Sequence, residues 1–280
     1  MRVQVGDVRL FFDVEGAKLR ADGPRMREVP TLVLLHGGPG FDHSIFKPEF
    51  SRLADIVQIV YLDHRGNGRS DRGAPEHWNL ERWGDDVRAF CDALEIERPI
   101  VMGESFGGMV AMAYAIRHPG HPSKLILAST AAKMRFDRSL EVFERLGGGE
   151  VREIARRFFE NPTQPVMAEY IRSCLPLYNQ RPQNQEWIAR SVQHMELTSF
   201  FFNGEIRRFD MLAELAKIRC PTLITAGDLD PITPIQNAED IAAAIAPGLA
   251  RLERFKNTGH GCQRDDPEKF FRIVREFLLS

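Results

Sequence analysis

One serine lies among glycines at the point where one apolar run ends and another begins. The stretch GESFGG, residues 103–108, contains the pattern G-x-S-x-G around Ser105. In a sharp turn between a strand and a helix, glycines two residues away from the serine avoid collisions, and its hydroxyl projects from the edge of the sheet. Backbone N–H groups at the start of the helix favour negative charge there. We therefore predict that Ser105 is a nucleophile at a strand-to-helix elbow.

A serine hydroxyl needs a base, and the base needs a carboxylate that orients it. His260 is the only histidine that follows Asp228 and Asp230 in the chain, and it lies in the glycine-flanked stretch FKNTGHGC. Asp228 and Asp230 precede it in LITAGDLDPITP, giving the order serine, acid, histidine. We expect Asp230 to orient the base because it lies further out along the loop, whereas Asp228 is expected to close the turn.

The anionic oxygen of a tetrahedral intermediate needs backbone donors. The N–H of Phe106 directly follows the nucleophile. The stretch HGGPG, residues 36–40, follows an apolar run and can supply the second donor. Gly38 is the first candidate and Gly37 the alternative, because glycine lets a backbone approach substrate closely.

Two other polar stretches are interpreted as scaffold. His36 is expected to shape its loop, since His260 already provides a base. The stretch DHRGNGRSD, residues 63–71, is expected to form a rigid turn with a charge pair. A phosphate-binding loop is less favoured there, because the Lys-Ser/Thr of a P-loop is missing.

The cysteines give no sign of a metal site or of a disulfide framework. They are widely spaced and contain no C-x-x-C pair, so we expect buried free thiols, no metal and no cofactor. The four positions are Cys91, Cys174, Cys220 and Cys262.

The elements that would position these residues alternate along the chain. Continuous apolar runs predict strands buried on both faces, and residues 3–14 predict a hairpin. Alternation of such strands with helices implies a mostly parallel sheet with helices on both faces. Strands are expected at 31–38, 55–63, 99–105, 124–130, 221–230 and 250–260, and helices at 79–96, 106–118, 234–246 and 266–279.

The alternation is interrupted in the middle of the chain. Residues 133–209 contain no clear buried strand, many charges and many aromatic side chains. We interpret this segment as an inserted helical cap. The predicted domains are therefore a core of residues 1–132 and 210–280 and a cap of residues 133–209.

Composition limits the other classes of function. The chain has 280 residues, is 43% hydrophobic and 27% charged, and carries a formal net charge of −2. No block of like charge indicates nucleic acid, and no run of 18 apolar residues indicates a membrane span. The N-terminal stretch alternates like a strand, so we expect a cytoplasmic protein. The expected partner is a small-molecule or short-peptide substrate, and the aromatic cap could form a homo-oligomer contact.

Taken together, the motifs resemble the α/β-hydrolase fold and, within it, the proline iminopeptidase-like group of serine peptidases. This resemblance spans the whole chain. It implies a triad of Ser105, Asp230 and His260 and a lid that shapes the substrate pocket. The matching motifs are HGGPG at 36–40, DHRGNGRS at 63–70, GESFGG at 103–108, GDLDPITP at 227–234 and TGH at 258–260.

Three functions follow from the resemblance. Aminopeptidases of the group hold a free amine with acidic side chains, one of which commonly follows the catalytic aspartate, where this chain has Pro231. Within the phenylalanine-rich stretch TSFFFNGE, residues 198–205, Glu205 is the one acid. A carboxylesterase or lactonase is therefore the alternative to an aminopeptidase. A small-ligand sensor on the same fold is the alternative of another class, and Ser105 argues against haloalkane and epoxide hydrolases, which use a carboxylate nucleophile.

Overall fold

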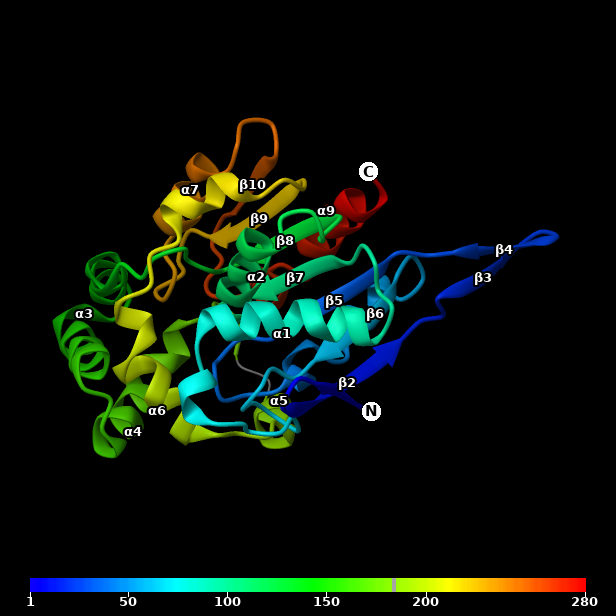
Figure 1. The fold of residues 1–280 in the computed structure, drawn as a ribbon. Coiled ribbons are helices and arrows are strands. Elements are labelled where there is room, and N and C mark those ends of the chain that lie inside the picture. The colour runs from blue at the N-terminus through cyan, green and yellow to red at the C-terminus, as the bar shows by residue number, and fades with distance from the viewer. Residues whose placement is uncertain (183–184) are drawn as a thin grey trace.

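An eight-stranded sheet forms the centre of the computed structural model, which describes residues 1–182 and 185–280 (Figure 1). Its strand order is β1-β2-β6-β5-β7-β8-β9-β10. The first two strands pair antiparallel, β2 is antiparallel to β6, and the pairs from β6 to β10 are parallel. The strands are β1 Arg2–Val5, β2 Val8–Glu15, β5 Thr31–Leu35, β6 Gln58–Leu62, β7 Ile100–Glu104, β8 Lys124–Ala128, β9 Thr222–Gly227 and β10 Ala250–Phe255.

The parallel strands are apolar throughout because both faces of the sheet are covered. In β5, Leu32 and Leu34 belong to one hydrophobic core, while Val33 and Leu35 belong to the other. This is the alternation expected of successive residues in a strand. The mostly parallel sheet with helices on both faces is thereby confirmed. The face of Val33 and Leu35 is covered by α1 Leu80–Ala93, α2 Phe106–Arg117 and α7 Ile235–Ala244. The face of Leu32 and Leu34 is covered by α9 Pro267–Leu279, with the short α8 Cys262–Asp265 before it.

A helical insertion separates β8 from β9 and has an apolar cluster of its own, which includes Phe143 and Phe158. A bridge between Lys133 and Asp210 joins the two ends of this segment. The domain boundaries at 132/133 and 209/210 stay a prediction from the sequence. None of the helices that the structure describes is long and apolar enough to cross a membrane. The helices of the insertion are α3 Phe136–Glu160, α4 Gln164–Ser173, α5 Gln185–Arg190 and α6 Met195–Asn203 (Figure 1).

Sequence patterns placed most elements within a few residues of their observed bounds. For example, α1 begins after Asn79, whose side chain accepts a hydrogen bond from the N–H of Arg82 at 2.9 Å. The hairpin of β3 Leu19–Asp22 and β4 Arg25–Glu28 was not predicted, and it projects away from the sheet at the end opposite the insertion (Figure 1). Its residues are almost all exposed, so no apolar alternation marks it. The Gly-Pro dipeptide at its turn is the signal that could have revealed it.

Candidate active site

Ser105 lies in a strained turn between β7 and α2. Its backbone angles are φ 55° and ψ −119°, which a residue with a side chain rarely adopts. The neighbouring glycines are required by close approach of the backbone. A Cβ on Gly103 would lie 2.1 Å from the carbonyl oxygen of Gly107, and a Cβ on Gly107 would lie 2.0 Å from that of Leu35. The elbow expected around Ser105 is therefore a sterically enforced feature of the fold.

Asp230 and His260 are joined in a buried hydrogen-bond network. The distance from His260 Nδ1 to Asp230 Oδ2 is 2.9 Å, and Asp230 is 1% exposed. Its carboxylate also accepts from the N–H groups of Ile232 and Thr233, at 2.8 and 2.9 Å, and from the Thr233 hydroxyl at 2.9 Å. These donors hold the carboxylate in one orientation. With Nδ1 engaged by Asp230, Nε2 of the neutral ring is left with a lone pair for a proton.

The other sequence candidate in this turn is placed differently. Asp228 is exposed, and its Oδ1 accepts from the N–H of Thr258 at 3.4 Å. That contact joins the loop after β9 to the loop after β10. The structure thus brings Asp230, and not Asp228, to the imidazole of His260.

Ser105 lines one small cavity together with a residue that contacts His260. Ser105 and Tyr178 both line it, and the Tyr178 ring packs against the His260 ring with 5.6 Å between centroids. Among the described residues, no hydrogen bond joins the Ser105 hydroxyl to the imidazole. Catalytic hydrogen bonds are often long without substrate and tighten in the Michaelis complex.

The loop of residues 36–40 lies against the nucleophile. A Cβ on Gly37 would lie 3.3 Å from Ser105 Cβ, and Gly38 lines the cavity together with Phe106. Gly38 has φ 128°, in the region that favours glycine. Both backbone segments expected to supply oxyanion donors therefore lie beside Ser105.

The polar side chains of the two stretches interpreted as scaffold are engaged by other parts of the protein. His36 is fully buried, its Nδ1 lies 2.8 Å from the Gly37 carbonyl, and burial lowers its pKa, so the ring is kept neutral. In the 63–71 loop, the charged side chains pair with other segments. Asp63 accepts from His43 Nδ1 at 2.7 Å, and the guanidinium of Arg65 binds Asp86 at 2.7 and 2.9 Å.

The cysteines are all buried and free, as the sequence predicts. Cys262, two residues after His260, is fully buried, and burial raises its pKa. In the part of the chain that the structure describes, no group of three or more His, Cys, Asp or Glu side chains is placed to hold a metal ion.

The cavity at Ser105 is small and mostly apolar. Its volume is about 30 Å³. Among the described residues, no carboxylate lines it. Its remaining lining, beyond Ser105, Phe106 and Gly38, consists of Met109, Met134, Phe159, Tyr170, Tyr178, Phe201, Phe202, Ile206 and Ile232.

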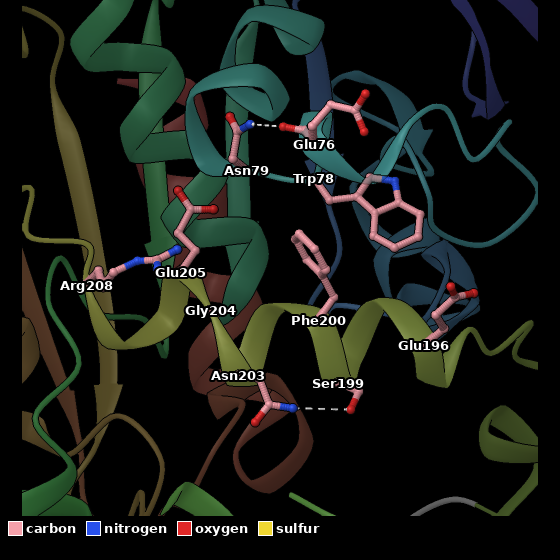
Figure 2. Close-up of a pocket in the computed structure, with 10 residues that line it drawn as sticks. All are labelled: Glu76, Trp78, Asn79, Glu196, Ser199, Phe200, Asn203, Gly204, Glu205 and Arg208. Atoms are coloured by element: carbon pink, nitrogen blue, oxygen red, sulfur yellow. Dashed lines mark hydrogen bonds between the residues drawn. The ribbon is translucent and has the colours of Figure 1, made fainter. Parts of the chain in front are cut away.

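A larger hollow of about 710 Å³ lies elsewhere on the cap (Figure 2). Phe200 packs edge-on against Trp78 in its wall, with 5.5 Å between ring centroids. Glu205 also lines this hollow, where its carboxylate oxygens accept from the N–H of Leu80 at 3.0 and 2.9 Å. Among the described residues, no histidine lines this hollow, so it lacks the base that serine chemistry needs.

Sequence reasoning missed the cap residues that hold the histidine loop. The N–H of His260 donates to the carbonyl of Tyr178 at 2.6 Å, and Asn179 Nδ2 donates to the His260 carbonyl at 2.7 Å. The Asp265 carboxylate accepts from the N–H groups of Gly259 and Gln180 at 2.7 and 3.0 Å. No motif or periodicity marks these partners, because they come from segments about 80 residues apart along the chain.

The chain is similar to a family of known proteins. Residues 30–267 match a family described as alpha/beta hydrolase fold. The chain is 28% identical to proline iminopeptidase PfmaB of Pestalotiopsis fici over 96% of this chain and 98% of that protein. It is 27% identical to the putative carbamate hydrolase RutD of a Caulobacter species over 88% of this chain and 90% of that protein.

The fold is also similar to that of a solved structure. Proline iminopeptidase from Mycobacterium smegmatis superposes with a TM-score of 0.80, covering 99% of this chain and 97% of that chain. The two sequences are 23% identical, so this similarity shows the shared fold alone.

Proposed function

Because the chain belongs to the alpha/beta hydrolase fold family, we propose that it is a serine hydrolase that cleaves a small ester or amide through an acyl-enzyme. The observation that carries the proposal is the buried contact between His260 Nδ1 and Asp230 Oδ2, at 2.9 Å, beside the strained turn at Ser105. A carboxylate, an imidazole and a serine hydroxyl in this order are the parts that nucleophilic acyl transfer requires.

The proposed reaction has two halves. Ser105 Oγ attacks the substrate carbonyl while His260 Nε2 accepts its proton, and Asp230 stabilises the resulting imidazolium. The N–H groups of Phe106 and Gly38 stabilise the oxyanion. The imidazolium then protonates the leaving group, and an acyl-enzyme remains. Water, deprotonated by the same ring, attacks the acyl-enzyme, and return of the proton to Ser105 releases the acid.

The lining of the cavity favours an uncharged acyl group. An amine of an aminopeptidase substrate would need a carboxylate partner, since a buried unpaired charge is costly. None lines the cavity, and Glu205, the acid that the sequence offered, instead accepts from the N–H of Leu80. A small ester, a lactone or an amide with an apolar acyl group is therefore the first candidate substrate.

An N-terminal proline amide is the second candidate. It is favoured by the similarity to PfmaB, which extends over nearly the whole of both chains. The two candidates differ in activity on p-nitrophenyl butyrate and on proline p-nitroanilide. We expect hydrolysis of the butyrate ester. Cleavage of the anilide alone would make the N-terminal proline amide the first candidate substrate.

The central test is replacement of the nucleophile. Ser105→Ala should lower kcat on p-nitrophenyl butyrate by roughly 10⁵- to 10⁶-fold, because the three residues act as a unit. A fluorophosphonate probe should label the native protein at Ser105 and should not label the variant. Retention of more than a tenth of the activity would contradict the assignment, and the absence of labelling in the native protein would favour a ligand sensor.

A further inference from the structure

Apart from Ser105, the polar side chains that line the Ser105 cavity belong to two tyrosines. Tyr170 lies on α4, and Tyr178 directly follows the short 3-10 helix Leu175–Leu177. Their hydroxyl oxygens are 2.7 Å apart. An enclosed apolar cavity thus has a phenol pair in its wall, in addition to the nucleophile.

The hydrogen bond between the tyrosines uses only one of their two hydroxyl hydrogens. Each phenol can donate once, and the described residues provide no second acceptor for this pair. Burial raises the pKa of both Tyr170 and Tyr178, so both remain protonated at neutral pH. One O–H therefore remains available to an acceptor inside the cavity. A buried donor without a partner costs free energy, so an acceptor on a ligand would be favoured there.

The position of this pair relative to the proposed base is well defined. The Tyr170 ring stacks on Phe158 with 4.0 Å between centroids. The Tyr178 carbonyl accepts from the N–H of His260 at 2.6 Å, and the Tyr178 ring packs edge-on against the imidazole. Both tyrosine rings are therefore held in place beside the cavity that Ser105 lines.

We propose that the Tyr170–Tyr178 pair donates a hydrogen bond to a second oxygen on the acyl group of the substrate. The preferred substrates are then esters, lactones or amides whose acyl chain carries an ether, keto or hydroxyl oxygen. The acyl group, and not the leaving group, is selected because it stays on Ser105 within the cavity while the leaving group departs. This inference rests on the proposed function and specifies the substrate class.

The test compares p-nitrophenyl esters that differ by one oxygen. Methoxyacetate is matched with butyrate, and levulinate with pentanoate, so that chain length is constant within each pair. The ratio of kcat/KM within a pair is measured for the native enzyme and for the double variant Tyr170→Phe/Tyr178→Phe. Differences in intrinsic ester reactivity cancel when the two ratios are divided. We expect the preference for oxygen in at least one pair to fall about 5- to 10-fold in the double variant, as for loss of one hydrogen bond.

The matched control is Tyr61→Phe, which removes a hydroxyl that bonds to Glu15 at 2.9 Å, away from the cavity. It should leave both ratios unchanged. Fluorophosphonate labelling of Ser105 checks that the double variant retains its site. If it does not, the two single variants replace it, and a fall of about threefold in at least one of them is expected.

The outcomes separate this inference from the proposed function. If the native enzyme hydrolyses butyrate but neither ratio changes on removal of the hydroxyls, the role of the tyrosines is wrong and the hydrolase assignment stands. If the native enzyme hydrolyses none of the esters and Ser105 is not labelled, both fail.

Discussion

Asp228 and Asp230 lie two residues apart in one turn, yet only Asp230 is buried and contacts His260. The distinction comes from the loop after β9, which directs the second carboxylate inward to Thr233 and the imidazole. The first stays at the surface and accepts a long hydrogen bond from the N–H of Thr258. Replacing each aspartate in turn therefore compares a buried carboxylate that contacts His260 with an exposed one in the same loop.

We predict that Asp230→Asn lowers kcat/KM by about 10⁴-fold, because the ring loses its orienting anion and its tautomer. Asp228→Asn is the matched control and should stay within about threefold of the native value, since surface substitutions away from special features have small effects. Steady-state kinetics on p-nitrophenyl butyrate measures both. Equal losses in the two variants would show that the contact between Asp230 and His260 has no special part in catalysis.

The glycines of the elbow also act at the scale of single residues. Gly103→Ala places a Cβ 2.1 Å from the carbonyl oxygen of Gly107, so the backbone has to shift. We predict a loss of about 1–3 kcal/mol in the free energy of unfolding, as for overpacking of a core. Urea denaturation measures it. Gly120→Ala, at a site with no atom within 4 Å, is the control and should be nearly neutral.

At the scale of elements, α6 separates the two hollows of the cap. Phe201 and Phe202 line the Ser105 cavity, whereas Phe200 lines the larger hollow with Trp78 (Figure 2). Residues one or two positions apart on a helix point in different directions, so one short helix can present different side chains to each hollow. We therefore expect the volume of the Ser105 cavity to depend on which phenylalanine is changed.

We predict that Phe202→Ala shifts the preferred acyl chain of p-nitrophenyl esters to greater length. The native cavity of about 30 Å³ should favour short chains, and removal of a ring from its wall provides space for further methylenes. Phe200→Ala on the same helix is the control and should leave the preferred length unchanged. The measurement is kcat/KM over a series from acetate to decanoate. An identical shift in both variants would mean that α6 acts through general loosening of the cap.

At the scale of the whole molecule, buried polar contacts tie the insertion to the core. Asp42 is fully buried beside the loop of residues 36–40. Burial by itself would raise the pKa of Asp42, but hydrogen bonds from Ser44, from the N–H of Val192 and from Arg69 lower it below its ordinary value. Since Val192 belongs to the insertion, ionised Asp42 links the two parts of the chain.

This link predicts a pH dependence of stability. A carboxyl whose pKa is lowered by folding stabilises the native state above its unfolded pKa of about 4, and this stabilisation is lost as the pH falls through the lower folded value. Asp42→Asn should therefore be less stable than the native protein by about 1–3 kcal/mol at pH 7, with a smaller difference below pH 4. Urea denaturation at both pH values measures this. The control, Asp22→Asn in the exposed β3–β4 hairpin, should have the same free energy of unfolding as the native protein at both pH values. If the stability loss of Asp42→Asn were the same at both pH values, ionisation of Asp42 would not be what stabilises the native state.

Much of the architecture follows from patterns within short stretches of sequence. Gly103 and Gly107 leave no room for a side chain, because the backbone of the elbow and of β5 lies too close to them. The continuous apolar runs indicate strands that are buried on both faces. Such signals survive in the sequence because they depend on neighbours along the chain or on a simple period. They predicted the alternating fold, the helical insertion and the positions proposed for nucleophile, acid and base.

Only the tertiary structure decided how the insertion meets the core. It directs Glu205 to the N–H of Leu80, brings Tyr178 and Asn179 onto the loop of His260, and encloses Ser105 in a cavity without a carboxylate. These contacts join segments far apart in the chain, and neither propensity nor hydrophobic period encodes which polar groups will meet there. The sequence by itself therefore determined the chemical groups and their order, while the packing of the insertion decided what surrounds them.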